Sequence, residues 1–425
     1  MSIKDSERGI ALKVLCEVLE DGGFSNIALR KAFRGGQPFD KKSKALVTEI
    51  VYTTIRNLLQ IDFVINHFSK CKIDKMEPII RNLLRLSVCQ MHYLDKIPAY
   101  ALVNEAVELA RAYGHQGLAG FVNGVLRNIA RNPGKPEIPR DDLGLLYSYP
   151  KELLGVLNGQ LSKTEMAEFA KNCHTPPPVT VFPNTAKISK EDLAKVLEGE
   201  SVKAEVLDSC IIIKETGDIS KLDSYKAGLF FVMDPGAYIP VKSLGLLPGE
   251  TFIDLAAAPG GKSFAAACAM NNQGEILAYD IHPHKIKLIE SGSKRLGLSI
   301  IKANIGDALV FYPALEAKAD AVLVDAPCSG LGTLRKHPEI KYRFEKKDIK
   351  RLAKQQLLML KTAARYLKPG GRLVYSTCTI TKEENYEVVS RLEKPGEINL
   401  LEAFQIMPAK TNDGFFVAKF VKNLV

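Results

Sequence analysis

The sequence predicts an α/β protein in three parts: an all-helical domain at residues 1–135, a small α/β module at 145–235 and a doubly wound α/β domain at 236–425. Apolar residues recur at helical spacing in the first part, whereas short apolar strands alternate with helices in the last. Between the first two parts, the run Asn132-Pro133-Gly134-Lys135-Pro136 is typical of a linker. A chain of 425 residues exceeds one ordinary hydrophobic core, so more than one domain is expected.

The first part is predicted to be a bundle of helices. Ile10, Val14 and Val18 lie on one helical face, and Gly22-Gly23 follows as a C-cap. The same periodicity predicts further helices at residues 45–68, 79–94, 101–113 and 120–129. Because no strand-like alternation interrupts them, we expect an all-α domain.

Strands are predicted in the second and third parts. In the middle module they are residues 179–182, 210–214 and 229–232. In the last part they are residues 251–255, 275–279, 299–302, 319–324, 371–376 and 415–420, with helices between them. This alternation is typical of a parallel sheet, and open sheets of that kind bind ligands at the carboxyl ends of their strands.

Composition limits the class of protein. Hydrophobic residues make up 46% and charged residues 25% of the chain, values typical of soluble globular proteins. The amino terminus has no apolar signal segment, and no run approaches the length of a membrane span. Eight cysteines without a Cys-x-x-Cys pair argue against a zinc site or a disulfide framework. We therefore expect a cytoplasmic protein with reduced thiols, no bound metal and no membrane contact. Composition does not address the oligomeric state, for which we expect a monomer.

The formal charge of +10 is concentrated near the amino terminus. Residues 1–140 hold 21 Lys and Arg against 14 Asp and Glu. The densest basic cluster consists of Arg30, Lys31, Arg34, Lys41, Lys42 and Lys44. Such a cluster can neutralise the phosphates of a nucleic acid, or it can be an ordinary solvated helix face. Charge alone leaves both interpretations open.

A glycine-containing loop follows the first strand of the last part. Its small residues would let the backbone approach a ligand, with the amides of the next helix facing it. Its members are Ala256, Ala257, Ala258, Pro259, Gly260, Gly261 and Lys262. The loop also matches the phosphate-binding pattern G-x-x-x-x-G-K-[ST] except at Ala256, so a nucleotide triphosphatase is a rival interpretation.

Acidic residues after the next strands favour a nucleoside ligand instead. Asp280 stands 19 positions after Gly261, close to the spacing at which a carboxylate binds ribose hydroxyls. Asp307 follows the third strand and could accept a hydrogen bond from an adenine amino group. Each Asp could equally be a helix cap or a turn residue. Carboxylates at the sugar and the base, with no phosphate required, suit S-adenosylmethionine.

Two cysteines and one carboxylate are predicted to converge at the same edge of the sheet. Asp325 and Cys328 follow one strand, and Cys378 follows another. A thiolate that adds to carbon 6 of cytosine activates carbon 5 for methylation, and an acid such as Asp325 offsets charge at the ring nitrogen. A second thiol can assist release of the product. Cysteine is also a common core residue, and spacing leaves open which thiol attacks.

Four segments resemble the RNA cytosine-5 methyltransferase family in order and spacing: residues 254–262, 325–332, 375–380 and 413–416. The helical first part resembles the antitermination factor NusB. The resemblance implies a Rossmann-like methyltransferase domain that methylates carbon 5 of one cytosine in small-subunit (16S) ribosomal RNA. Relatives with the same catalytic domain modify transfer RNA, and a non-catalytic RNA-binding scaffold is a further alternative.

The resemblance also implies roles for individual residues. Cys378 would be the nucleophile, and Cys328 the thiol that helps release the product. S-adenosylmethionine would be bound by the loop 256–262 together with Asp280, Asp307 and Asp325. The segment with Arg335, Lys336 and His337 matches the family and is expected to contact RNA.

Overall fold

The computed structural model describes residues 2–34, 39–94, 97–134, 136–215, 217–392 and 397–424. They form two compact units, Met1–His174 with Lys336–Phe344, and Thr175–Arg335 with Glu345–Val425. The first unit includes residues 145–174, which the sequence pattern assigns to the middle module. The boundaries of the three sequence-based domains therefore stay predictions. Lys135, at the end of the first predicted domain, lies outside the described residues.

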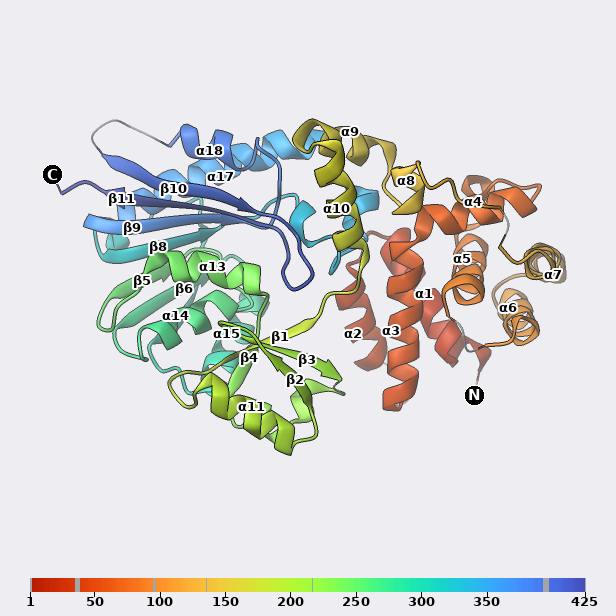
Figure 1. The fold of residues 1–425 in the computed structure, drawn as a ribbon, viewed down its shortest axis with the longest axis horizontal. Helices are drawn as coiled ribbons and strands as arrows, with labels where there is room; N and C mark the ends of the chain where they lie inside the picture. The colour runs from red at the N-terminus through yellow and green to blue at the C-terminus, as the bar shows by residue number, and fades with distance from the viewer. Residues whose placement is uncertain are drawn as a thin grey trace. The chain divides into compact units, whose positions relative to one another are not determined.

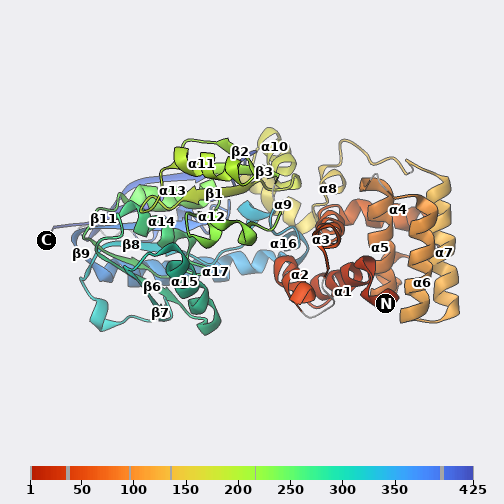
Figure 2. The same cartoon turned by 90° about the horizontal axis from the view of Figure 1, so that it is seen from below.

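The first unit is helical, as predicted (Figure 1). Its α-helices are α1 (Glu7–Leu19), α2 (Ser25–Arg34), α3 (Lys41–Arg56), α4 (Leu58–Phe68), α5 (Pro78–Tyr93), α6 (Ala99–Tyr113), α7 (Gln116–Arg131), α8 (Leu143–Leu146), α9 (Lys151–Gln160), α10 (Lys163–His174) and α16 (Ile340–Arg343). The single helix predicted over 45–68 is two helices, because the chain leaves helical geometry at Asn57. Figure 2 shows α6 and α7 side by side along one edge of this unit.

Helix starts in the first unit follow from local sequence. The side chains of Ser6 and Asp40 accept hydrogen bonds from the amides of Gly9 and Ser43, which caps α1 and α3. Pro78 occupies the first turn of α5, where its missing amide hydrogen costs nothing. The apolar faces meet in one core that includes Leu12, Leu15, Ile50, Ile55 and Leu83.

Residues 336–344 belong to the first unit although the chain on either side belongs to the second. The buried carboxylate of Glu339 accepts hydrogen bonds from Ser25 N and Ser25 Oγ at 3.1 and 3.0 Å. Lys341 donates to the carbonyl oxygens of Arg56 and Tyr147 at 3.1 and 3.0 Å. Burial, with the nearby Arg56 charge, lowers the pKa of Lys341 to about 7. The segment is thus anchored by buried polar contacts.

The smaller sheet of the second unit is antiparallel, in the order β2-β3-β1-β4. Its strands are β1 (Val179–Pro183), β2 (Lys203–Val206), β3 (Ile211–Glu215) and β4 (Phe230–Val232), and α11 (Lys190–Gly199) packs on one face. Three of these strands match the predicted ones. Strand β2 escapes the sequence pattern because it is an edge strand with four exposed residues.

The larger sheet has seven strands in the order β10-β11-β9-β8-β5-β6-β7. They are β5 (Thr251–Asp254), β6 (Glu275–Asp280), β7 (Ile301–Ile305), β8 (Ala319–Asp325), β9 (Leu367–Thr377), β10 (Ile398–Ile406) and β11 (Phe415–Lys422). In Figure 1, α13 (Pro235–Leu244), α14 (Gly261–Ala269) and α15 (Pro283–Leu296) cover one face, and α17 (Lys346–Tyr366) and α18 (Tyr386–Ser390) cover the other. The predicted α/β class is confirmed.

The sheet is mixed rather than wholly parallel, which corrects one expectation. Strands β5 to β9 run parallel, but β11 pairs antiparallel with both β9 and β10. From β5 the chain continues to β6 on one side and later to β8 on the other. The carboxyl end of β5 is therefore the topological switch point at which such sheets bind ligands. None of the helices in the described ranges is long and apolar enough to cross a membrane.

Candidate active site

The two predicted thiols lie side by side at the carboxyl ends of β8 and β9. These strands are parallel neighbours in which Asp325 pairs with Ser376, so the loops that follow leave the sheet together. The Sγ atoms of Cys328 and Cys378 are 3.3 Å apart, and both cysteines are free and partly buried. The structure therefore brings together two residues that are 50 positions apart in the chain.

Cys328 has surroundings that favour its protonated form. Contact with the sulfur of Cys378 is the largest cause that raises the pKa of Cys328 well above its ordinary value, followed by burial and by the charge of Glu384. A thiol that keeps its proton can donate a hydrogen bond to a neighbouring sulfur but is a poor nucleophile.

The Cys328 loop is held by a buried carboxylate. Glu384 is fully buried, and its Oε1 accepts hydrogen bonds from Ser329 N at 2.9 Å and Gln356 Nε2 at 3.1 Å. Its Oε2 accepts from Ser329 Oγ at 2.5 Å and Thr381 Oγ1 at 2.7 Å. Gln356 Nε2 also donates to the carbonyl oxygen of Pro327 at 2.9 Å. These contacts fix the backbone on both sides of Cys328.

The Cys378 loop is fixed by other contacts. The amide of Gly332 donates to the carbonyl oxygen of Cys378 at 2.9 Å. A Cβ atom at residue 332 would lie 2.2 Å from the carbonyl oxygen of Gly414, so only glycine allows this close approach. Asn385 accepts from Thr377 Oγ1 at 2.6 Å and donates to the carbonyl oxygen of Thr379 at 3.1 Å. Both thiols thus stand on rigid backbone.

Asp325 forms an ion pair with Lys262, the last residue of the glycine-containing loop. Lys262 Nζ lies 2.6 Å from Asp325 Oδ2, and the lysine side chain is largely buried. Burial alone would lower the pKa of Lys262, but the charges of Asp325, Asp254 and Cys378 outweigh it and raise that pKa. The ammonium also lies 5.3 Å from the centre of the Phe415 ring. Lys262, at the end of the glycine-containing loop, is therefore close to both Asp325 and Cys378.

The glycine-containing loop is shaped to receive a ligand at the switch point. Gly260 has φ of +110° immediately before α14, a conformation that other residues rarely adopt. Buried Ala257 anchors the loop by donating its amide to the carbonyl oxygen of Tyr279 at 2.8 Å. Ala256, Ala258, Gly261 and Lys262 are partly accessible and Pro259 is exposed. Below the loop, Asp254 Oδ1 is buried with no hydrogen-bond partner, and burial raises the pKa of this carboxyl to about 7. The small residues and the positive φ of Gly260 leave space at the switch point for the backbone to approach a nucleoside.

Asp280 ends β6, and Asp307 lies two positions after β7. One oxygen of each also makes a local turn contact: Asp280 accepts from the amide of His282 and Asp307 from the amide of Leu309, both at 2.9 Å. Both residues are therefore turn residues, as one of the two interpretations expected, and this role does not exclude ligand binding. Asp280 and the loop that carries Asp307 lie at the carboxyl ends of the parallel strands β6 and β7, at the same edge of the sheet as the thiols.

The basic cluster lies on the surface of the first unit. All six of its side chains are exposed. Ile27, Arg30, Lys31 and Arg34 follow one another at i, i+3, i+4 and i+7, which places them on one face of α2. The other three members lie in the first turn of α3, where the helix dipole disfavours cations.

The segment 335–337 is less accessible than the basic cluster. Arg335 is 2% exposed, and its guanidinium donates to the carbonyl oxygens of Ala409 at 2.7 Å and Pro176 at 3.0 Å. Lys336 and His337 are partly buried. The structure therefore does not support the RNA contact expected of Arg335, because its guanidinium is buried and already donates hydrogen bonds to backbone carbonyl oxygens.

Sequence reasoning missed Glu384 and Asn385, which hold the two thiol loops. A signal was present in Thr381-Lys382-Glu383-Glu384-Asn385, a polar run that directly follows the nucleophile candidate. What the run could not reveal is that Thr381, Glu384 and Asn385 are buried, whereas Lys382 is exposed.

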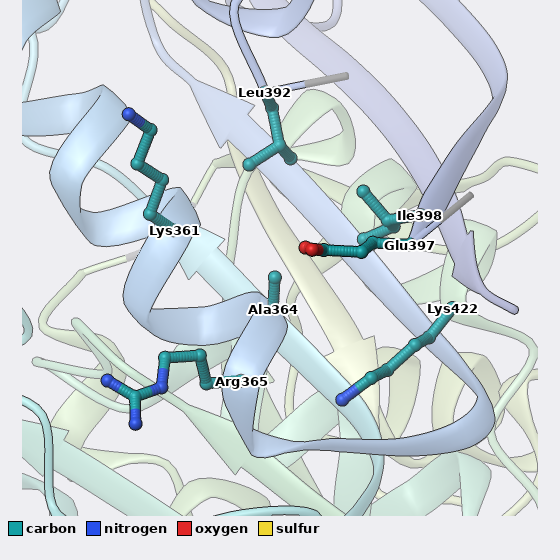
Figure 3. A pocket seen from close by; sticks show the side chains of 7 residues that line it. All are labelled: Lys361, Ala364, Arg365, Leu392, Glu397, Ile398 and Lys422. Carbon is teal, nitrogen blue, oxygen red and sulfur yellow. The ribbon is translucent and has the colours of Figure 1, made fainter. Parts of the chain in front are cut away.

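A pocket of about 390 Å³ elsewhere in the second unit is separate from this site (Figure 3). Its lining includes Arg365, just before β9, Ile398 at the start of β10 and Lys422 at the end of β11. These positions mark the end of the sheet opposite to Cys378. Among the described residues, no group of three or more His, Cys, Asp or Glu side chains could hold a metal ion.

The strand order, the ligand loop at its switch point and the adjoining carboxylates define a Rossmann-like methyltransferase that uses S-adenosylmethionine. Comparison with known families agrees. The family 16S rRNA methyltransferase RsmB/F matches residues 241–421, and the NusB family matches residues 5–131.

Individual relatives cover nearly the whole chain. A Bacillus subtilis protein named "Probable ribosomal RNA small subunit methyltransferase B" is 37% identical over 91% of this chain and 88% of its own. A protein of the same name from Synechocystis is 31% identical over 98% and 99%. The crystal structure of PH0851 has a TM-score of 0.82 at 27% identity, over 97% of this chain and 98% of that one. The chain belongs to the RsmB/F methyltransferase family, which confirms the resemblance.

Proposed function

We propose that this protein transfers a methyl group from S-adenosylmethionine to carbon 5 of one cytosine in small-subunit (16S) ribosomal RNA. The observation that carries the proposal is the pair of thiols 3.3 Å apart beside the Lys262–Asp325 ion pair. The cofactor supplies an electrophilic methyl group. The glycine-containing loop, Asp280 and Asp307 would bind its nucleoside and place the methyl group against the target ring.

Cys378 would attack as the thiolate, after its proton has passed to solvent. Its sulfur forms a bond to carbon 6 as the C5–C6 double bond opens, and the ring nitrogen N3 gains a proton from the Lys262–Asp325 pair. Carbon 5, now electron-rich, would take the methyl group, and S-adenosylhomocysteine would leave with the electrons of the broken sulfur–methyl bond. The carbon 5 proton then leaves to water, and its bonding electrons restore the double bond as the sulfur–carbon bond breaks. The proton on N3 returns to the ion pair.

Cys328 would assist the last step. Because its surroundings favour the protonated thiol, it can donate a hydrogen bond to the sulfur of Cys378 as that sulfur leaves carbon 6. The two thiols are then not interchangeable, although their sulfur atoms touch.

The RNA would lie on the basic surface of α2 and the first turn of α3. The three lysines of α3 stand at its N-terminus, where the helix dipole disfavours cations, so they do not stabilise the helix. Lys44 Nζ lies 5.8 Å from the centre of the Phe33 ring on α2, so the basic residues of the two helices are neighbours. Since both faces of the target ring must be reached, we expect an unstacked or single-stranded cytosine.

Methyl transfer from radiolabelled S-adenosylmethionine tests the activity, with 16S ribosomal RNA and bulk transfer RNA as separate substrates. Label in 16S RNA, mapped to one cytosine by bisulfite sequencing, is expected. Label in transfer RNA alone would indicate the related activity, and no label in either would indicate a non-catalytic scaffold.

Variants of the thiols test the roles. Cys378→Ala should abolish turnover and form no covalent adduct. Cys328→Ala should allow attack but slow release, so that a protein–RNA conjugate accumulates on a denaturing gel. Conjugate in the Cys378 variant instead would mean that the two roles are reversed.

A further inference from the structure

The two thiols touch each other but have different charged neighbours. Cys378 is close enough to Lys262 to contribute, after Asp325 and Asp254, to the raised pKa of that lysine. The charge of Glu384 contributes to the raised pKa of Cys328. A neighbouring cation for one thiol and a neighbouring anion for the other make two chemically identical groups unequal.

Glu384 is built into the structure as a carboxylate. Its four hydrogen-bond donors are one backbone amide, two hydroxyls and one side-chain amide, described above. An ionised carboxylate is an acceptor with about four positions for donors, so the surroundings match the charged form. The side chain has no exposed surface, and its four described hydrogen bonds come from neutral donors. Its position serves the Cys328 loop.

We propose that Glu384 is a positioning residue that decides which thiol attacks: it clamps the Cys328 loop and keeps negative charge beside that sulfur, so Cys328 retains its proton and Cys378 is left to act as nucleophile. This inference rests on the proposed division of labour between the thiols. It adds the group that imposes that division.

Other groups near the pair act consistently with this assignment. Burial and the contact with Cys378 also favour the protonated form of Cys328. Asp325 is paired with Lys262 at 2.6 Å. The hydroxyl of Tyr375 donates to the carbonyl oxygen of Glu384 at 2.6 Å, and burial raises the pKa of that phenol well above its ordinary value, so it stays neutral. Glu384 is therefore the carboxylate whose charge adds to these effects on Cys328.

The first test uses the unmodified protein. Brief treatment with iodoacetamide at pH 7.5, followed by peptide mass spectrometry, reports which cysteine is alkylated first. We expect Cys378 to be alkylated at least about tenfold faster than Cys328, the ratio that one pKa unit would give. Faster alkylation of Cys328 would overturn the proposal, and this result does not depend on any variant folding.

The second test removes the charge but keeps the shape. In a Cys378→Ala background, Glu384→Gln should move the pH profile of Cys328 alkylation towards lower pH, with about tenfold faster reaction at pH 8. Glu387→Gln, the same change at an exposed position, is the matched control and should leave the profile unchanged. An unchanged profile in a Glu384→Gln variant with an unaltered unfolding temperature would reduce Glu384 to a purely structural clamp and refute the proposal.

Neither measurement uses RNA or cofactor. If the alkylation results are as expected but no methyl group is transferred, the proposed function is wrong. The proposal that Glu384 keeps Cys328 protonated then still stands. If methyl transfer occurs but the alkylation results differ from those expected, the proposed function stands and the proposed role of Glu384 is wrong.

Discussion

Replacing Arg335 by alanine should destabilise the second unit rather than weaken RNA binding. The sequence resemblance places Arg335 in a segment expected to contact RNA, but the guanidinium is buried and donates to backbone carbonyls from two other parts of the chain. Removing it breaks those hydrogen bonds and leaves the carbonyl groups of Ala409 and Pro176 without this donor.

The size of the effect follows from these contacts. Hydrogen bonds to a charged group each contribute about 1.5–3 kcal/mol. The two shortest, at 2.7 and 3.0 Å, would together contribute the most, and the gain from no longer burying a guanidinium offsets part of their loss. We therefore expect a loss of about 3–4 kcal/mol, close to the range for breaking buried polar networks. For a domain of this size that corresponds to an unfolding temperature lower by roughly 10 °C.

Differential scanning calorimetry of the Arg335→Ala variant measures this loss. Arg351→Ala is the matched control, because Arg351 is exposed on α17 and pairs only with its helix neighbours Asp348 and Gln355 among the interactions described. We expect the control to change stability by less than about 0.5 kcal/mol. An Arg335→Ala variant that unfolds at the wild-type temperature but binds RNA more weakly would refute this reasoning and restore the RNA contact.

Three other perturbations have defined outcomes. Changing Lys41, Lys42 and Lys44 to Glu should weaken RNA binding and lower the slope of log affinity against log salt by about 2, measured by filter binding; an unchanged slope would make this a solvated surface. Lys262→Met removes the ammonium 2.6 Å from Asp325 and should lower kcat roughly 100-fold at saturating RNA, whereas a wild-type kcat would exclude the ion pair as the proton donor. Asp254→Asn should change the pH dependence of stability. Since burial raises the folded-state pKa of Asp254 to about 7, wild-type stability should fall as pH rises from 4 to 7, and the variant should lack this component by urea unfolding at pH 5 and 8.

The sequence predicted the elements whose residues are buried on a regular period. The apolar runs before Asp325 and Cys378 lie in central strands of the sheet and are buried. Because both faces of these strands are covered, neither face needs polar residues and the run stays apolar. Two of the edge strands lack this signal, since β2 is exposed throughout and β10 has one buried residue. The helix predicted over 45–68 also shows the limit, since periodicity continues through the break at Asn57.

By itself, then, the sequence determined that two thiols and three carboxylates follow successive strands, and parallel strands carry such residues to one edge. Only the tertiary structure decided that the sulfur atoms are 3.3 Å apart, that Lys262 pairs with Asp325 and that Arg335 is internal. Local pattern fixes a residue's place along a strand or helix. Its burial, its charge partners and its freedom to meet a ligand depend on segments far along the chain, as Glu384 and Ser329 illustrate across 55 positions.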